Sequence, residues 1–297
     1  MSLGIRLKSL VQRLAGAPGP DAGIDEERAW AGSAQSQPGP RLADPVLDSS
    51  LREHGYAVIE GFLESGEVEE LAALFHGEAS PVHDQPFASS IRSEDPGYKL
   101  RVSHGIGRVF GPRIEQHLHG YRYCFAGFLV KAPGGGGEGD GTVPLHQDIA
   151  MMNEAEYQGL GIWVPLVDTN AENGCLCVVP GSQKLSAKLR WPGSHFAFNA
   201  IRQELTEKLV QVPLKAGSAI VYCQKLIHFS APNRTAETRI VAGALAAPKD
   251  APLLYYHEDQ AAGLLEVFVV DDDFYVSHTY GDRPEGAAQI ARIRKPD

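Results

Sequence analysis

The chain has 297 residues, of which 43% are hydrophobic and 22% charged, and its formal net charge is −10 at pH 7. This length is enough to bury a sizeable core, and an all-β sandwich or barrel of this size is commonly one domain. The negative charge, with no basic stripe interleaved with aromatic residues, excludes a general nucleic-acid binder. No apolar stretch approaches the roughly 18 residues that span a bilayer, so no transmembrane segment is expected.

The first 44 residues are expected to stand apart from the folded domain. A basic amphipathic helix is predicted over residues 1–14 from leucines at helical spacing and from nearby cations: Leu3, Leu7, Leu10 and Leu14, with Arg6, Lys8 and Arg13. Such a helix either packs on its own domain or makes weak contact with a membrane surface or a partner protein. The following residues, to about 44, are rich in Ala, Gly, Pro, Ser and Gln and are expected to be a flexible linker.

Residues 45–297 are expected to form a single domain with its core at about 50–250. Helices are predicted over 45–54 and 65–75, the second with Ser65 as N-cap, and a strand begins at Gly55 between them. Residues 76–120 are ambiguous. β-Branched and aromatic residues between Gly and Pro turns predict further strands over 122–131, 159–168, 175–179, 209–214, 218–223 and 238–245. Short strands without helical crossovers indicate a mainly β fold, an antiparallel double-stranded β-helix (a cupin-like jelly roll) with flanking helices.

Three further segments allow two interpretations each. The glycine run over residues 134–141 is either a loose hairpin loop or a mobile edge of an active-site mouth. Residues 185–207 form an insertion whose Trp191, His195, Phe196 and Phe198 are candidates for substrate contact. Residues 264–270 fit a strand or a helix.

The four cysteines, Cys124, Cys175, Cys177 and Cys223, show no CxxC pair and no zinc-ligand spacing. All four lie in apolar runs that resemble strands. They are expected to be buried thiols in a reducing compartment, which predicts a cytoplasmic protein.

A His-x-Asp pair, His146 and Asp148, is followed 82 residues after His146 by His228. Two histidines and one carboxylate are the ligand set of non-haem Fe(II) oxygenases. Residues two apart on a strand face the same side, so one strand can supply both ligands. The pair alone is a weak signal, because residues 257–259 and 76–78 have the same spacing. Only His146 is followed at long range by a histidine that comes after an apolar run, 219–222, and precedes an arginine, Arg239.

Arg239 opens an apolar run, residues 239–245, that predicts a buried strand. A buried arginine needs an anionic partner. Its planar guanidinium suits a carboxylate, and the distal carboxylate of 2-oxoglutarate is the natural candidate. Ser230, two residues after His228, offers a further hydroxyl donor.

Four stretches together resemble the phytanoyl-CoA dioxygenase family of Fe(II)/2-oxoglutarate oxygenases. They are His146-Gln147-Asp148, the run Gly161-Ile162-Trp163-Val164-Pro165-Leu166, the run 173–184 with sequence NGCLCVVPGSQK, and His228-Phe229-Ser230 with Arg239. The resemblance covers roughly residues 50–250, and the motifs follow the family's order. One departure is Gln183, where the family usually has histidine; that position is not a ligand.

The resemblance implies a role for each matching residue. His146, Asp148 and His228 would hold Fe(II), Arg239 and Ser230 would bind the far carboxylate of the cosubstrate 2-oxoglutarate, and Trp163 would line its pocket. Dioxygen would be the second cosubstrate, and succinate and CO2 would be released. Related halogenases replace the carboxylate ligand with a small residue, so Asp148 favours hydroxylation. The expected substrate is a small organic or acyl-type molecule, and the basic N-terminal helix would suit an amphiphilic or carrier-bound one.

Two other classes of protein remain open. A jelly roll with the same three ligands could be a redox-neutral, cupin-type isomerase or hydrolase, which would need neither Arg239 nor 2-oxoglutarate. The chain could also be a non-catalytic binding protein on an oxygenase fold, although the complete ligand set argues against it.

Overall fold

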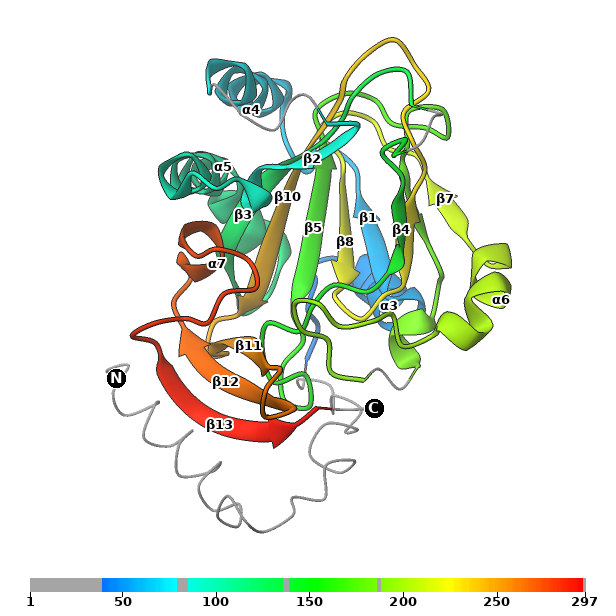
Figure 1. Ribbon diagram of the computed structural model, residues 1–297. Helices are drawn as coiled ribbons and strands as arrows, with labels where there is room; N and C mark the ends of the chain where they lie inside the picture. Colours follow the sequence, from blue (N-terminus) through cyan, green and yellow to red (C-terminus); the bar gives the residue numbers. More distant parts are fainter. Residues whose placement is uncertain (1–38, 79–84, 136–138, 186–187, 296–297) are drawn as a thin grey trace.

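The computed structural model describes residues 39–78, 85–135, 139–185 and 188–295, and the helix and most of the linker predicted for residues 1–44 lie outside this range. Two antiparallel sheets face each other, and a third, smaller sheet lies beside one end of them (Figure 1). This arrangement confirms the predicted mainly β, jelly-roll architecture with flanking helices.

The major sheet has six strands in the order β1–β8–β5–β10–β3–β2. Their bounds are β1 (Tyr56–Ile59), β8 (Ala219–Cys223), β5 (Leu160–Pro165), β10 (Arg239–Pro248), β3 (Tyr121–Lys131) and β2 (Phe87–Ser89). The minor sheet has the order β4–β9–β6–β7, with β4 (Val143–His146), β9 (His228–Ser230), β6 (Leu176–Val178) and β7 (Val210–Val212). The third sheet contains β11 (Leu253–Asp259), β12 (Leu264–Val270) and β13 (Ala288–Arg294), so residues 264–270 form a strand.

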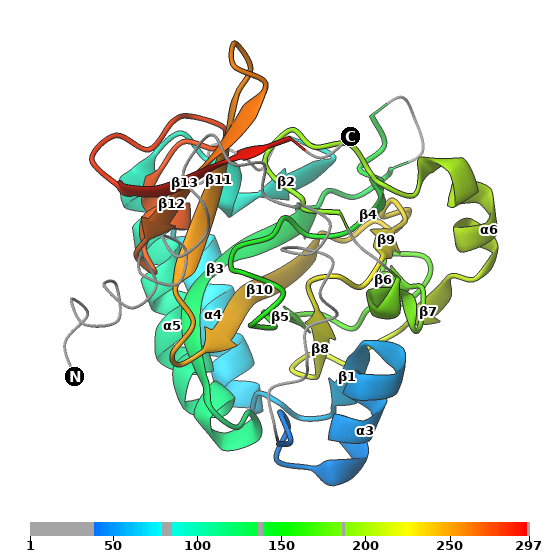
Figure 2. The same cartoon turned by 90° about the horizontal axis from the view of Figure 1, so that it is seen from below.

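The helices lie on or beside the major sheet, except for one that lies beside the minor sheet (Figure 1). They are α3 (Pro45–His54), α4 (Ser65–Gly77), α5 (Pro96–His117), α6 (Arg202–Glu207) and α7 (Phe274–Ser277), with short 3-10 turns η1 (Ser90–Arg92), η2 (Ser182–Lys184) and η3 (Asn199–Ile201). Figure 2 shows α4 and α5 on one face of the major sheet and the minor sheet on the other. None of the described helices combines the length and hydropathy needed to cross a bilayer.

The central strands β5 and β8 of the major sheet bury both of their faces. On β5, Ile162 and Val164 belong to the core shared with the helices, whereas Trp163 packs toward the minor sheet. Side chains alternate between the two faces of a strand, so Tyr222 of β8 and Arg239 of β10 point to the same inner face as Trp163. The inner face therefore receives the polar and aromatic residues that later form the candidate site.

The long helix α5 occupies the region that the sequence left ambiguous. Its four glycines and an internal Pro112 lower its helix propensity. Two of these glycines have a packing reason: a Cβ at Gly105 would lie 2.5 Å from Leu74 of α4, and one at Gly107 would lie 2.7 Å from Tyr123 of β3. Close packing therefore stabilises a helix that local propensity does not predict.

Two details of the predicted elements are wrong. Helix α4 has Glu64 as its N-cap, in a reciprocal capping box with Glu67, and Ser65 is its first residue. Strand β4 ends at His146, so Asp148 lies in the loop beyond it rather than on the same strand. The four cysteines are free and buried, as predicted.

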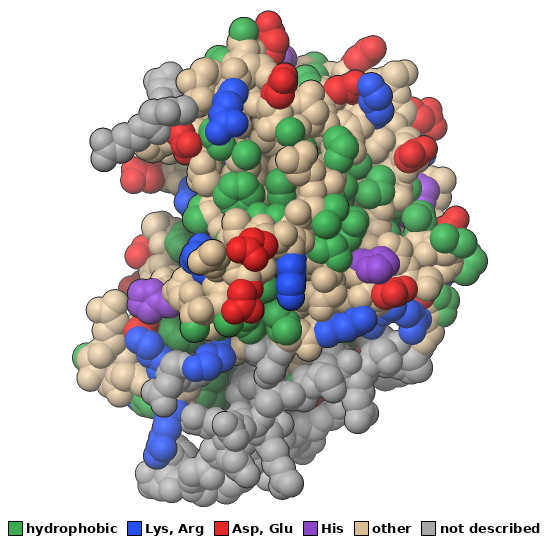
Figure 3. All heavy atoms as spheres, turned by 90° about the vertical axis from the view of Figure 1, so that its right-hand side faces the viewer, with side chains coloured by type: hydrophobic (Ala, Val, Ile, Leu, Met, Phe, Trp, Pro, Cys, Tyr) green, Lys and Arg blue, Asp and Glu red, His purple; other side chains and the backbone are tan. Residues whose placement is uncertain are grey.

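The face that carries α6 and β7 shows hydrophobic side chains scattered among charged ones (Figure 3). Three exposed apolar residues, Leu185, Ile201 and Val210, belong to the insertion or directly follow it. The insertion thus contributes surface as well as packing.

Gly174 is expected to be irreplaceable in the turn before β6. It has φ +76°, and a Cβ there would lie 2.3 Å from the carbonyl oxygen of Ala231. Gly120 has a similar φ of +73° and open space around it, so Gly120→Ala reports the backbone strain alone. We expect Gly120→Ala to lower the free energy of unfolding by about 1–2 kcal/mol and Gly174→Ala by clearly more, measured by urea denaturation. Equal losses would mean that the turn relaxes around the added methyl group.

Candidate metal centre

His146, Asp148 and His228 converge at one edge of the space between the two sheets. Their potential ligand atoms all lie within 4.8 Å of one another, and among the described residues they are the one group of this kind. The Nε2 atoms of His146 and His228 lie 3.9 and 3.8 Å from Oδ1 of Asp148. The structure therefore brings together the three residues selected from the sequence.

A bulge in the minor sheet sets the two histidines opposite each other. Strands β4 and β9 pair Val143 with Ser230 and His146 with His228, so three steps on one strand match two on the other. Such bulges redirect side chains and are frequent near active sites. As a result, the two imidazole centroids are 4.1 Å apart.

Hydrogen bonds to backbone carbonyls fix the orientation of both imidazoles. Nδ1 of His146 lies 2.7 Å from the Pro144 oxygen, and Nδ1 of His228 lies 3.0 Å from the Leu226 oxygen. A carbonyl can only accept, so each Nδ1 carries the proton and donates. Each Nε2 then has its lone pair directed at the centre, as a metal ligand requires.

Electrostatics keep His146 in the neutral form that binds metals. Loss of solvation, followed by the nearby His228, lowers the pKa of His146 to about 4. Neighbouring Asp148 acts in the opposite direction but is outweighed. The imidazole is therefore uncharged at neutral pH and available as a ligand.

Asp148 is held on two sides by residues that the sequence did not single out. The Tyr222 hydroxyl donates to its Oδ2 at 3.1 Å, and Nε of Arg190 donates to its main-chain oxygen at 2.5 Å. Burial, with the neighbouring Asp148 charge, raises the pKa of Tyr222 well above its usual range, so it stays a donor. Gln147, between the two ligands, donates to the Lys225 carbonyl and ties their loop to the segment before His228.

A cavity of about 190 Å³ contains the three candidate ligands and reaches Arg239. Its walls also carry Trp163, Ser230 and Tyr222, together with Arg92 and the apolar residues Phe87, Leu129, Val143, Leu176 and Phe229. The candidate metal ligands and the candidate 2-oxoglutarate contacts named from the sequence thus all line one cavity.

Arg239 is 2% exposed, and its Nε and Nη1 atoms are buried with no hydrogen-bond partner. Its guanidinium lies 5.6 Å from the centre of the Trp163 ring. Burial lowers the pKa of Arg239 to about 9, so the group is still a cation at neutral pH. A buried cation with unused donors in a cavity fits an anionic ligand.

Ser230 lines the same cavity, but its hydroxyl donates to the Gly174 carbonyl at 2.9 Å. To donate to a bound carboxylate, it must rotate away from that oxygen. Trp163 is nearly buried on the inner face of β5 and forms a wall beside Arg239.

Lys131 is a fully buried residue that sequence reasoning missed. It lies opposite Arg239 in the β3–β10 pairing. Its Nζ donates to the carbonyl oxygens of Gly141, Ser230 and Ala231, which belong to the segments before β4 and at the end of β9. Only the strand register reveals this position, because a lysine that ends an apolar run normally reaches solvent.

The other sequence candidates lie elsewhere. His257 and its neighbours belong to β11 of the third sheet. The insertion aromatics do not line the metal cavity: Trp191 packs on the third sheet, and Phe196 and Phe198 pack near Leu145. Their candidacy for substrate contact at the metal therefore has no support in this geometry.

The family model described as Phytanoyl-CoA dioxygenase (PhyH) matches residues 51–241. A relative named Phytanoyl-CoA dioxygenase domain-containing protein 1, from Danio rerio, is 33% identical over 122 residues, which cover 38% of this chain and 40% of that protein. Phytanoyl-CoA dioxygenase 1 from Oryza sativa subsp. japonica is 34% identical over 139 residues, 44% of this chain and 48% of that protein. The match thus spans less than half the length of these relatives.

Solved structures share the fold. The carbocyclase SnoK, described as non-heme and alpha ketoglutarate dependent, aligns with a TM-score of 0.54 at 21% identity and covers 84% of this chain and 97% of its own. The epimerase SnoN, in complex with Fe3+, alpha ketoglutarate and nogalamycin RO, aligns with a TM-score of 0.53 at 21% identity, over 85% of this chain and 96% of its own.

Removing the Tyr222 hydroxyl should weaken metal binding. We expect Tyr222→Phe to lower the affinity for Ni(II) about tenfold, because Asp148 loses its orienting donor. Calorimetric titration gives the affinity. Tyr275→Phe is the matched control, since the Tyr275 hydroxyl is also buried but donates to Leu254, in another core cluster. Unchanged affinity in Tyr222→Phe would show that Asp148 is oriented without this bond.

Lys131 should make stability depend on pH. Burial, together with the charge of Arg239, lowers its pKa to about 7, whereas an unfolded lysine titrates near 10.4. Between these values the unfolded chain holds a proton that the folded chain has released, so the free energy of unfolding rises with pH.

Between pH 7 and 9 we expect wild type to gain up to about 1.4 kcal/mol per pH unit relative to Lys131→Met, measured by urea denaturation. The exposed Lys249, substituted in the same way, is the control. Parallel curves for wild type and Lys131→Met would mean that the three carbonyl oxygens keep Lys131 charged throughout.

Proposed function

Because the chain belongs to the phytanoyl-CoA dioxygenase family, we propose that it is an Fe(II)- and 2-oxoglutarate-dependent dioxygenase. The reaction proposed is hydroxylation of an unactivated carbon in a small organic or acyl-type substrate, with release of succinate and CO2. The observation that carries the proposal is the buried guanidinium of Arg239, whose Nε and Nη1 have no hydrogen-bond partner among the described residues, in the same cavity as His146, Asp148 and His228.

The three ligands suit iron by their chemistry. Two neutral imidazoles and one carboxylate form the ligand set of non-haem Fe(II) oxygenases, which leaves positions for other ligands. Both Nε2 atoms face the Asp148 carboxylate, at 3.9 and 3.8 Å from its Oδ1. The presence of Asp148 favours hydroxylation over halogenation, which would need that position vacated.

2-Oxoglutarate suits the rest of the cavity. The Nε and Nη1 atoms of Arg239 have no hydrogen-bond partner among the described residues, and the planar guanidinium favours a bidentate contact with the distal carboxylate. Lys131 lies on the neighbouring strand and does not compete for the ligand, because its Nζ faces three carbonyls. Trp163 packs beside the site, and Ser230 is close enough to line it.

Iron, 2-oxoglutarate and dioxygen together supply the oxidative decarboxylation and the oxidation of a C–H bond. The chain's own residues orient and shield these reactants. Carbonyls at Pro144 and Leu226 hold the imidazoles, and Tyr222 holds Asp148. Apolar walls from Phe87, Leu129 and Val143 limit the entry of water into the cavity.

The proposal assigns the oxygenase to one domain over residues 45–297. An amphiphilic or carrier-bound substrate would agree with the basic helix predicted for residues 1–14. A redox-neutral cupin-type enzyme has no use for a buried arginine with unused donors, so that alternative is less well supported.

The first test is anaerobic addition of Fe(II) and then 2-oxoglutarate, followed by visible spectroscopy. Wild type should develop the weak charge-transfer band of the iron–2-oxoglutarate complex, and His228→Ala should not. His257→Ala, a histidine of the third sheet, is the matched control and should behave as wild type.

In Arg239→Ala the same band should need about tenfold or more 2-oxoglutarate, because the charge-assisted contact with the distal carboxylate is lost. Metal affinity should stay unchanged in this variant. A wild-type protein that binds metal without developing the band, or equal 2-oxoglutarate affinity in both proteins, would favour the redox-neutral cupin alternative.

A further inference from the structure

A second cavity, of about 540 Å³, lies beside the metal centre and shares no lining residue with the first. Residues 188–191 and 193–197 of the insertion form most of it, and Gly263 and Lys295 complete it from the third sheet. Its volume falls in the range of sites for small organic ligands. We call it the insertion cavity.

The lining of the insertion cavity is basic. In the part of the chain that the structure describes, it includes Lys188, Arg190, His195 and Lys295, and no aspartate or glutamate, whereas the net charge of the whole chain is −10. Two of these cations form ion pairs with carboxylates: Arg190 with Glu154 and Lys295 with Glu258, each at 2.6 Å. Among the described residues, the side chains that line the cavity thus include four basic ones and no acidic one. A basic hollow on an acidic protein attracts anions.

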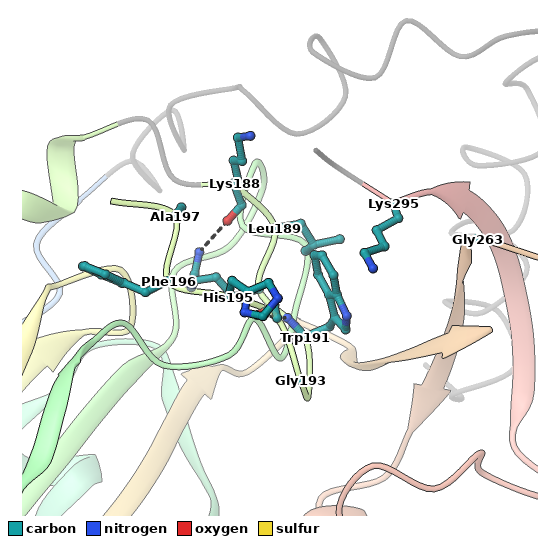
Figure 4. Close-up of a pocket in the computed structure, with 11 residues that line it drawn as sticks. Lys188, Leu189, Trp191, Gly193, His195, Phe196, Ala197, Gly263 and Lys295 are labelled. Atoms are coloured by element: carbon teal, nitrogen blue, oxygen red, sulfur yellow. Dashed lines mark hydrogen bonds between the residues drawn. The ribbon is translucent and has the colours of Figure 1, made fainter. Parts of the chain in front are cut away.

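Two aromatic walls of the cavity are held in place. The Trp191 indole donates to Glu258 at 2.8 Å, and the ring packs on the third sheet. Phe196 meets Phe198 edge to face, with the Arg202 guanidinium 4.9 Å from its ring centre. Figure 4 shows His195 between Phe196 and Trp191, with Lys295 on the far side of the indole. Fixed rings of this kind bind apolar bodies at low entropic cost.

We propose that the insertion cavity is a second ligand site, which binds an organic anion: a carboxylate or phosphate group on an apolar body. The cations hold the charged group and Trp191 and Phe196 contact the body, the division of roles seen in small-molecule sites. This ligand is distinct from 2-oxoglutarate, whose proposed contacts lie in the other cavity.

Arg190 connects the insertion cavity to the metal centre. Its side chain lines the cavity and donates to the main-chain oxygen of Asp148. The Ala150 N–H donates to the Arg190 oxygen at 2.9 Å, so the two segments pair directly. A ligand in the insertion cavity therefore contacts the segment that holds the loop of a candidate metal ligand.

A pair of fluorescent probes tests the site without using catalytic activity. The anionic probe is 1-anilinonaphthalene-8-sulfonate, and N-phenyl-1-naphthylamine has the same aromatic body without the charge. The full chain is titrated with each probe in the presence of Ni(II) and excess 2-oxoglutarate, and again as Arg239→Met without them. The second titration keeps the test independent of the proposed function, because it removes the competing cation in the metal cavity.

The anionic probe should bind wild type, and the double variant K188Q/K295Q should raise its Kd about tenfold, as expected for the loss of two partly exposed charges. The Kd of the neutral probe should change less than about twofold. The matched control K208Q/K249Q removes two exposed lysines that do not line the cavity and should leave both values unchanged. His195→Gln gives an independent single variant with a smaller loss in the same direction.

Several results would overturn the proposal: no binding of the anionic probe to wild type, equal weakening in the control, equal weakening of the neutral probe, or loss of binding in Arg239→Met. Competition by benzoate and by phenyl phosphate then shows whether the site prefers a ligand with a carboxylate or one with a phosphate group. Displacement mainly by one of them assigns the site to carboxylates or to phosphates, and displacement by neither contradicts the proposed ligand class.

Discussion

The uncompensated charge on Arg239 is the constraint on which the rest of this structure depends. An isolated buried cation costs several kcal/mol unless it finds an anion. The Trp163 ring at 5.6 Å offsets only part of this cost. Lys131, buried on the next strand, does not offset it, because its Nζ faces three carbonyl oxygens and not the guanidinium. The inner face of the major sheet is therefore poised for a carboxylate, and its binding relieves an electrostatic cost built into the fold.

The two sheets divide the chemistry between them. The minor sheet and its loops present the candidate metal ligands, and the major sheet supplies Arg239, Trp163 and Tyr222 from three neighbouring strands. Tyr222 crosses from one sheet to the other, because it leaves β8 and donates to Asp148 in the loop after β4. Helices pack behind the major sheet and keep its strands fixed, so the distance between anion site and metal centre is set by core packing.

Local pattern was enough to predict most strands, the convergence of His146, Asp148 and His228, and the burial of Arg239, because these depend on residue type, parity and spacing. It did not predict α5, in which Gly105 and Gly107 are explained only by their contacts with α4 and β3. Nor did it find Lys131, Tyr222 or Arg190. Their roles depend on strand register and on pairings across 42 to 100 positions, which one sequence does not encode locally.

The insertion shows why such long-range pairings matter for function. Its aromatic residues suggest a cover over the substrate, yet its main contribution to the metal centre is a backbone contact made by Arg190. Asp148 lies beyond the end of β4, outside the hydrogen-bonded ladder that holds His146. A ligand residue in a loop needs another support, and the insertion supplies it together with Tyr222. The same arginine lines the insertion cavity. A ligand bound there would therefore influence the position of Asp148 through Arg190, without touching any residue proposed to contact 2-oxoglutarate.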